Sequence, residues 1–503
     1  MTSEVYGAKV RLKFSILINF VMRILSLSAG LLFTISVTRK LSVEDFGTWT
    51  MLFKYISYVL PFAAIFSYWL PRTISRGFNT AKAGLFLSII LGLTASIAYM
   101  FIGWGASTFF NQPLIPLLIA TIIVLQEYLY RGLLNIALAH APQYRGIAIF
   151  TIRAAQAISA LGLVVFLRLG LYGAVIAAII GRSCGLLLLF VVNSKVISSS
   201  VFDFSIVKGW IRKSWLPLYG NLVLMLSSLD VLIIRGIVGS EEPIAYYGIS
   251  MSVLGIAMMS VHVSPALYAR LLAKRDVKDV FEAFWVSYML LIPMVIGIFV
   301  YTKPILAIYN IKYTVAVWIV RLFALAALFR MFSTILATTL GGFEYRDLVE
   351  NISLRETVLF KTPTLRLVIT AIYLLVIVTT SYIFGQDSLV IGSCWGFAYL
   401  LRFLLLTCLL DRLLRKEFNI RLPYSDFTKT IAKFLLSSLT IVVLSMLFPV
   451  EPQISIWKLL EDFVPILIIS VLAYFSTLYL IDTKFRTFFK TGVRYVVKEV
   501  LKL

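Results

Sequence analysis

Charged residues are scarce in this sequence, and acidic ones are scarcer than basic ones. Charged side chains make up 14% of the 503 residues, with 24 Asp and Glu against 46 Lys and Arg. Soluble domains carry about 25% charged residues, so this low share excludes a chain built of several soluble domains. Hydrophobic residues reach 60% and the mean hydropathy is +0.94. This composition is typical of a polytopic membrane protein.

Metal-binding side chains are also few. The sequence has 2 His and 3 Cys, and the cysteines, Cys184, Cys394 and Cys408, all fall inside apolar runs. Their separation fits no metal-binding motif, and buried thiols behave as small apolar side chains. We therefore expect no metal site and no cofactor.

Apolar runs recur along the whole chain. Each is long enough to cross a hydrocarbon core of about 30 Å as a helix, so we predict an all-α protein with about fourteen transmembrane helices. The predicted spans are residues 12–37, 47–70, 82–107, 113–138, 146–168, 171–193, 215–238, 244–269, 281–303, 313–340, 365–385, 389–410, 427–448 and 462–481.

Every second connection between these spans is basic. The basic set begins with Lys9, Arg11 and Lys13 and ends with the tail from Lys484 to Lys502. Lys and Arg concentrate on the cytoplasmic side of multi-pass proteins, so we expect a plasma-membrane protein with both termini cytoplasmic. The net charge of +22 then reflects topology and contact with anionic inner-leaflet lipids, and we expect no nucleic-acid partner. The tail is predicted to be a basic amphipathic surface helix.

The chain contains a short internal sequence repeat. Residues 35–49 and 233–248 both carry an apolar helix end, an Arg, an acidic pair, and then aromatic residues and a Gly. This repeat predicts two six-helix lobes, residues 1–195 and 196–424, followed by an extra helix pair and the tail at 425–503. Repeats of this kind place a substrate site at the interface between the halves.

The short link LSVEDFG, residues 41–47, joins the first two predicted helices, and Arg72 and Arg76 follow the second. This arrangement resembles the start of the polysaccharide-biosynthesis flippases of the O-antigen and teichoic-acid type, which belong to the multidrug/oligosaccharidyl-lipid/polysaccharide exporter superfamily. Ser42 and Val43 stand where the family pattern has Gly-Pro. The resemblance covers roughly residues 1–340. It implies alternating-access transport of a polyprenyl-linked oligosaccharide from the inner to the outer leaflet, without a catalytic residue.

Two other functions remain open at this stage. A drug or cation antiporter of the same superfamily predicts an acidic cavity with a carboxylate on the first helix, where this chain has Arg23. A membrane glycosyltransferase or polymerase could use Glu44 and Asp45 as a metal-binding pair. Such an enzyme needs a large outer loop around these acids, whereas the link here is short. The acids also suit the positive N-terminus of the second helix.

Ionisable residues inside the predicted spans mark the candidate site, because charges in a bilayer usually face the bundle interior. Cations outnumber anions in these spans, which favours an anionic ligand such as a polyprenyl (pyro)phosphate. The alternative is that the cations pair with acids inside the bundle or extend to the lipid head groups, so that no ligand is needed. Arg330 is preferred over Arg321 because the two lie on opposite sides of one helix, and Glu127 could instead pair with Arg131. The candidate substrate-binding residues are Arg23, Lys54, Arg182, Arg330 and Arg321, and Arg402 is a further intramembrane cation. The polar residues that could line the cavity and couple transport to Na⁺ or H⁺ are Asn19, Glu127 and Asp230.

Overall fold

The computed structural model describes residues 12–75, 77–212, 214–258, 267, 271, 276–344 and 354–495. Within these residues it is helical and has no strand. Thirteen of the described helices are long and apolar enough to cross a membrane. The prediction of an all-α, multi-pass membrane protein is therefore confirmed. Of the predicted span 244–269, α13 (Glu242–Ala257) is described, and most of the remainder lies outside the described residues.

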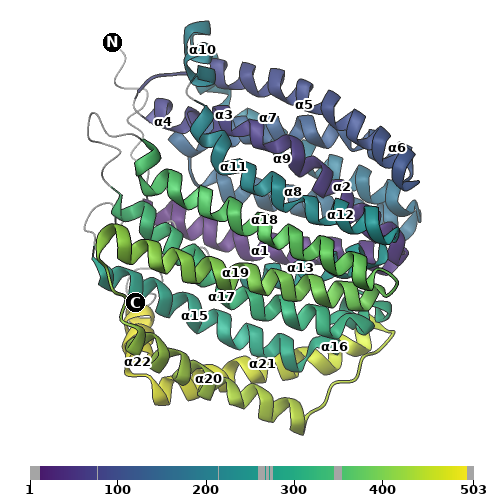
Figure 1. The fold of residues 1–503 in the computed structure, drawn as a ribbon, viewed down its shortest axis with the longest axis vertical. Coiled ribbons are helices and arrows are strands. Elements are labelled where there is room, and N and C mark those ends of the chain that lie inside the picture. Colours follow the sequence, from purple (N-terminus) through teal and green to yellow (C-terminus); the bar gives the residue numbers. More distant parts are fainter. Residues whose placement is uncertain are drawn as a thin grey trace. The chain divides into compact units, whose positions relative to one another are not determined.

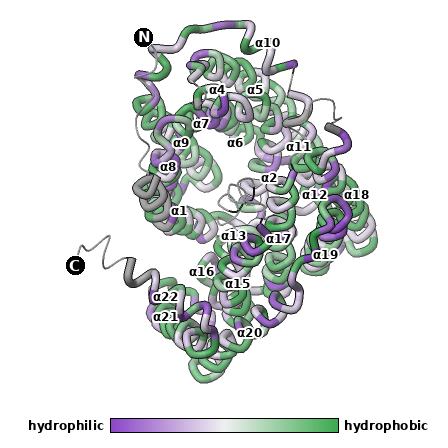
Figure 2. The backbone as a smooth tube through the Cα atoms, turned by 90° about the vertical axis from the view of Figure 1, so that its left-hand side faces the viewer, coloured by the Kyte–Doolittle hydropathy of each residue, from purple (hydrophilic) through white to green (hydrophobic). Residues whose placement is uncertain are grey.

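The chain divides into two compact units, which we describe separately. Unit 1 comprises residues 1–248 and 374–388, and unit 2 comprises residues 249–373 and 389–503. In both, hydrophobic residues cover most of each spanning helix and hydrophilic ones gather in the connections (Figure 2). This division does not test the predicted lobe boundaries at residues 195 and 424, which stay a prediction.

Unit 1 contains the helices from the N-terminal side of the chain (Figure 1). α1 packs along α8, α8 along α9, and α7 lies against both α5 and α9. Its elements are α1 (Leu12–Lys40), α2 (Val43–Val59), η1 (Leu60–Ala63), α3 (Ala64–Ser67), α4 (Leu70–Ser75), α5 (Ala81–Phe110), α6 (Leu114–Ile119), α7 (Thr121–His140), α8 (Tyr144–Ala160), the π-helical η2 (Leu161–Phe166), α9 (Gly170–Ser198), α10 (Phe204–Arg212), α11 (Trp215–Ser227), α12 (Leu229–Val238) and the first part of α13.

Unit 2 is built around α15, which packs against α17 and α20, with α21 beside α20 (Figure 1). Its elements are α15 (Val277–Val300), α16 (Thr302–Tyr309), η4 (Ile311–Ala316), α17 (Val317–Phe343), η6 (Leu354–Glu356), most of α18 (Val358–Phe384), α19 (Ser388–Phe418), α20 (Tyr424–Leu447), α21 (Ile456–Ile481) and α22 (Thr483–Tyr495). α22 is the described part of the basic tail, and residues 496–503 lie outside the description.

The second membrane span contains a sequence-determined interruption of its α-helix. It runs from Val43 to Ile74, but regular α-helix ends at Val59 and gives way to the 3₁₀ turn of η1. Pro61 stands at the start of that turn, where it lacks the N–H that an α-helix interior needs. At the other end, the Ser42 side chain caps α2 by accepting a hydrogen bond from the Asp45 N–H. The link 41–47 is thus a capped helix start.

Candidate functional site: an arginine cluster in unit 1

Glu127 lies at the centre of a charged cluster inside unit 1. On α7, its Oε1 accepts from Arg131 Nε at 3.0 Å, an i,i+4 pair. Its Oε2 lies 3.9 Å from Nε of Arg182 on α9. One carboxylate is therefore shared by two guanidinium groups, and its single negative charge compensates only one of them.

Two further arginines extend this cluster. Arg153 of α8 interacts electrostatically with Arg182, Glu127 and Arg23 of α1. Its Nη1 donates to Gln156 Oε1 at 3.3 Å, which brings no negative charge. Within the described part of the chain, neither Arg23 nor Arg153 forms an ion pair. We call Arg23, Arg131, Arg153 and Arg182 with Glu127 the unit 1 arginine cluster; it carries four positive charges and one negative.

Close helix packing sets the positions of these side chains. A Cβ on Gly181 would come within 2.6 Å of the Ile152 carbonyl oxygen, so only glycine lets α9 approach α8 this closely. The neighbours of these two residues in sequence, Arg182 and Arg153, are thereby held near each other. On the other side, the Arg153 Cδ would lie 3.7 Å from a Cβ on Gly30 of α1. The Arg153 side chain is exposed and that of Arg182 is half-buried.

A second group of charges joins α2 to α12 and differs from the cluster because its members are paired. Lys54 Nζ lies 3.2 Å from Oδ1 of Asp230, whose exposed fraction is 2%. The same ammonium lies 4.7 Å from the Tyr247 ring centre, a cation–π contact. Beside it, Tyr58 donates to the Ser228 carbonyl at 2.6 Å. We call Lys54, Tyr58, Ser228, Asp230 and Tyr247 the α2–α12 junction.

The two echoing turns of the sequence meet at one end of this junction. A Cβ on Gly47 would lie 2.5 Å from the Glu241 carbonyl oxygen, so the turns at 41–47 and 238–248 are in contact. Glu241 also pairs with Arg235 at 3.1 Å. Arg235 in turn donates to the Phe110 carbonyl at 2.6 Å, and Gln112 Nε2 approaches Glu241 at 3.4 Å. These contacts tie together α2, α12 and the end of α5.

In unit 2 the two candidate arginines of α17 lie in different environments. Arg321 donates to the Phe299 carbonyl, at 2.9 Å from Nη2, and to Thr302 Oγ1 at 3.2 Å. It therefore satisfies the Phe299 carbonyl near the C-terminal end of α15, where a cation is favourable. Arg330 donates to the Tyr399 hydroxyl of α19 at 2.8 Å. The two share no partner.

The structure thus sorts the predicted site residues into separate groups. Arg23, Arg182 and Glu127 belong to one cluster, and Lys54 and Asp230 form an ion pair with each other. Asn19 lies in α1, but its side chain is outside the described part of the structure. Sequence reasoning missed Arg153, although it lies about two turns inside the predicted span 146–168; scoring every cation at such depth would have found it. Among the described residues, no three His, Cys, Asp or Glu side chains gather as metal ligands.

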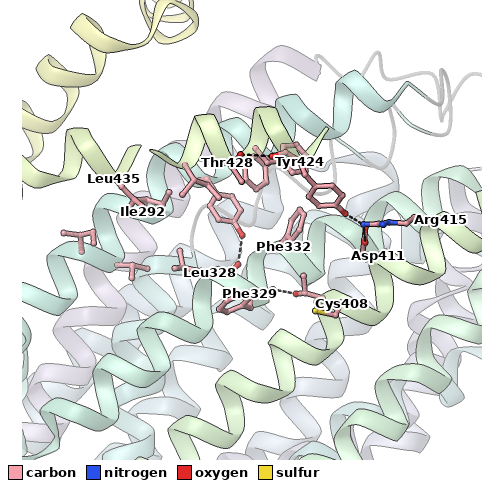
Figure 3. Close-up of a pocket in the computed structure, with 17 residues that line it drawn as sticks. Ile292, Leu328, Phe329, Phe332, Cys408, Asp411, Arg415, Tyr424, Thr428 and Leu435 are labelled. Carbon is pink, nitrogen blue, oxygen red and sulfur yellow. Dashed lines mark hydrogen bonds and ion pairs between the residues drawn. The ribbon is translucent and has the colours of Figure 1, made fainter. Parts of the chain in front are cut away.

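A pocket of about 500 Å³ lies inside unit 2, between α15, α17, α19 and α20 (Figure 3). Its walls are mainly aromatic and aliphatic, including Phe332 and Phe427. At one end Asp411 pairs with Arg415 at 2.6 Å and accepts a hydrogen bond from Tyr424. The pocket therefore offers an apolar surface with a neutralised polar end and suits a hydrocarbon chain better than an ion.

No protein-family model matches the chain, and no curated protein matches it in sequence. Solved structures do match its fold. The lipid II flippase MurJ in an inward closed conformation aligns with a TM-score of 0.64 at 15% identity, covering 93% of this chain and 98% of that one. An inward-facing multidrug resistance MATE family transporter of the MOP superfamily aligns at 0.56 and 16%, covering 80% and 99%. A Pyrococcus furiosus MOP superfamily transporter, described with a binding pocket of reversed polarity, aligns at 0.53 and 15%, covering 82% and 96%. The chain therefore has the fold of MOP superfamily transporters.

Proposed function

We propose that this protein is a flippase that moves a polyprenyl-(pyro)phosphate-linked oligosaccharide from the inner to the outer leaflet by alternating access. The fold it shares with a lipid II flippase and with MATE transporters supports a transporter. The unit 1 arginine cluster supports an anionic head group as its substrate. No bond is made or broken in such transport, so the side chains have to bind, release and move.

The main support for the proposal is the excess positive charge of the unit 1 arginine cluster. Two of its four arginines share one carboxylate, and Arg23 and Arg153 have no ion pair among the described residues. Each charge inside a membrane costs about 2.5–3.5 kcal/mol on insertion scales, so such a surplus is usually a functional site. Arginine binds phosphate oxygens through two parallel N–H donors. A pyrophosphate presents enough oxygens to engage more than one of these arginines at once.

The same surplus weighs against the antiporter alternative. A site for drug cations or for Na⁺ and H⁺ requires exposed carboxylates, whereas Glu127 is already engaged by Arg131 and Arg182. Glu127 could still couple transport to an ion if substrate binding drew the arginines away from it. Its two partners would then pair with phosphate, and the released carboxylate would accept H⁺ or Na⁺.

The α2–α12 junction would supply the moving part. The two turns at its end, 41–47 and 238–248, meet at the face that the charge bias assigns to the outside, with Gly47 packed on Glu241. Outward release of the sugar requires this contact to open, together with the Lys54–Asp230 pair beneath it. Two discrete arrangements of packed helices are what alternating access needs.

Binding to purified protein in neutral-lipid nanodiscs tests the proposal. We expect saturable binding of polyprenyl pyrophosphate and much weaker binding of the uncharged polyprenol. Arg23→Gln and Arg153→Gln should each weaken pyrophosphate binding by about tenfold or more, since a hydrogen bond to a charged group contributes about 1.5–3 kcal/mol. Arg168→Gln, which removes an equal charge from an exposed position after η2, is the control. Equal affinity for the two lipids would overturn the proposal.

A further inference from the structure

A second group of unpaired arginines lies inside unit 2. Arg330 on α17, Arg366 on α18 and Arg402 on α19 all lie within spanning helices. Arg330 has one hydrogen bond, to Tyr399, and Arg402 has one, from Nη2 to Thr370 Oγ1 at 3.0 Å. Among the described residues the Arg366 guanidinium has none. Arg366 lies one turn before Thr370, the hydrogen-bond partner of Arg402, and the two guanidinium groups interact electrostatically. Among the described residues none of the three has an ion pair, and each guanidinium offers five N–H donors.

These arginines do not face the lipid. On α18 the exposed side chains are Val368, Ile372 and Leu375, which lie on the opposite side of the helix from Arg366 and Thr370 at 100° per residue. On α19 the exposed Phe397 and Leu404 likewise lie opposite Arg402. Since the cations point into unit 2, snorkelling to the lipid head groups does not account for them.

Aromatic rings and hydrogen bonds hold this group in place. The Arg402 guanidinium lies 4.9 Å from the Tyr373 ring centre and 5.6 Å from that of Phe403. Phe403 also lies 5.7 Å from the Arg330 guanidinium. Tyr373 itself accepts a hydrogen bond from Trp395 Nε1 at 2.8 Å. Cation–π contacts orient guanidinium planes without using their N–H groups, so these donors remain available to a ligand.

We propose that Arg330, Arg366 and Arg402 form an anion-binding site within unit 2 that binds an oxyanion, either a phosphate or a carboxylate group. The ring faces beside it suit a sugar that carries such a group. The site uses residues of unit 2 alone and does not depend on the transported substrate being lipid-linked. It differs from the Arg321 site, where the Phe299 carbonyl and the Thr302 hydroxyl accept hydrogen bonds from the guanidinium.

Thermal unfolding of the full chain in phosphatidylcholine nanodiscs tests this site. Phosphate or glucuronate, added at constant ionic strength against chloride, should raise the unfolding temperature of the wild type in a saturable manner. Arg366→Gln and Arg402→Gln should each raise the apparent Kd for the anion at least tenfold. Arg366→Lys should lie between them and the wild type because it keeps the charge and loses the planar fork. Arg412→Gln removes a charge from an exposed position of the same α19 and should bind like the wild type.

A second arm distinguishes the source of the oxyanion. Nanodiscs in which phosphatidylglycerol replaces part of the phosphatidylcholine supply a lipid phosphate. Stabilisation that appears with phosphatidylglycerol alone and is lost in Arg402→Gln would support the site and assign it to a head group. Absence of anion-dependent stabilisation in the wild type, or the same stabilisation in Arg366→Gln and Arg402→Gln, would overturn the proposal. The polyprenyl pyrophosphate assay on Arg23→Gln is independent of this result, so either proposal can fail alone.

Discussion

The α2–α12 junction and the unit 1 arginine cluster use the same kinds of side chain in opposite ways. At the junction and the turns at its end each cation has its own acid: Lys54 pairs with Asp230 and Arg235 with Glu241. In the cluster one acid, Glu127, stands against four arginines. Paired charges neutralise each other across two helices, and separating them leaves an uncompensated buried charge. Unpaired charges stabilise nothing by themselves and provide a place for an anionic ligand.

Removing an unpaired charge should have the largest effect on transport. Arg23→Ala should abolish export while expression and unfolding temperature stay near those of the wild type, because Arg23 forms no ion pair with the residues that the structure describes. Arg23→Lys should keep part of the activity, since it retains the charge without the bidentate fork. Export of the proposed lipid-linked oligosaccharide in cells reports the outcome, with Arg168→Gln as the control. Normal export by Arg23→Ala would remove this residue from the anion site.

Locking the junction should stop transport completely but reversibly. Val43→Cys and Ser240→Cys place thiols in the two turns that meet where Gly47 packs on Glu241, in a chain whose Cys184, Cys394 and Cys408 are replaced. A disulfide needs Cα atoms within about 7 Å, so it should form while the turns are in contact. Oxidation should stop export and reductant should restore it. Each single cysteine is a control, and full export by a quantitatively crosslinked chain would contradict alternating access at this junction.

Breaking a pair at the junction should affect stability more than binding. Asp230→Asn leaves Lys54 buried without its acid, and removal of one partner of a buried pair costs about 3–5 kcal/mol. Lys54→Met combined with Asp230→Asn should recover most of this loss, because both charges are then gone. Denaturant unfolding in detergent measures the difference, with Glu44→Gln at the exposed start of α2 as the control. Equal destabilisation of the single and double variants would show that the pair is not the cause.

We predict that the turns beside the junction face the outside of the cell. Thiol labelling tests this prediction with substitutions that should leave transport unchanged. In a chain without its natural cysteines, Ser240→Cys should react with an impermeant thiol reagent added to intact cells. Thr491→Cys on the exposed face of α22 should react only after the membrane is permeabilised. The reverse labelling would invert the predicted topology and would move the junction to the inner face.

The sequence predicted the spans well because each is a simple physical pattern. α5 at Ala81–Phe110 and α9 at Gly170–Ser198 lie within a few residues of the apolar runs 82–107 and 171–193. The partners of the intramembrane charges could not be predicted in this way. Lys54 and Asp230 are 176 residues apart, and only helix packing brings them together. An i,i+4 pair such as Glu127–Arg131 is visible in sequence, whereas the contribution of Arg182 to it is not.

Arg366 was absent from the predicted site residues because the start of its helix was predicted too late. The span predicted at 365–385 placed Arg366 at a helix end, where a cation can reach water. α18 begins at Val358 instead, so Arg366 lies two turns inside the helix and becomes part of the unit 2 group. Hydropathy locates the centre of a span better than its ends, because charged residues within a helix shorten the apolar run.

Transbilayer movement of a lipid-linked sugar by the purified protein tests the central claim most directly. Proteoliposomes would contain a polyprenyl-pyrophosphate oligosaccharide labelled on its sugar with a dithionite-sensitive fluorophore, and bleaching of inner-leaflet label would report flipping. We expect the wild type to expose nearly all of the label. Arg23→Ala and Arg153→Ala should leave about half protected, as in protein-free liposomes, and a labelled phosphatidylcholine should not be flipped by any variant. Two results would contradict the account. In one, the wild type flips the pyrophosphate lipid no faster than protein-free liposomes do. In the other, the wild type and Arg23→Ala flip it equally fast.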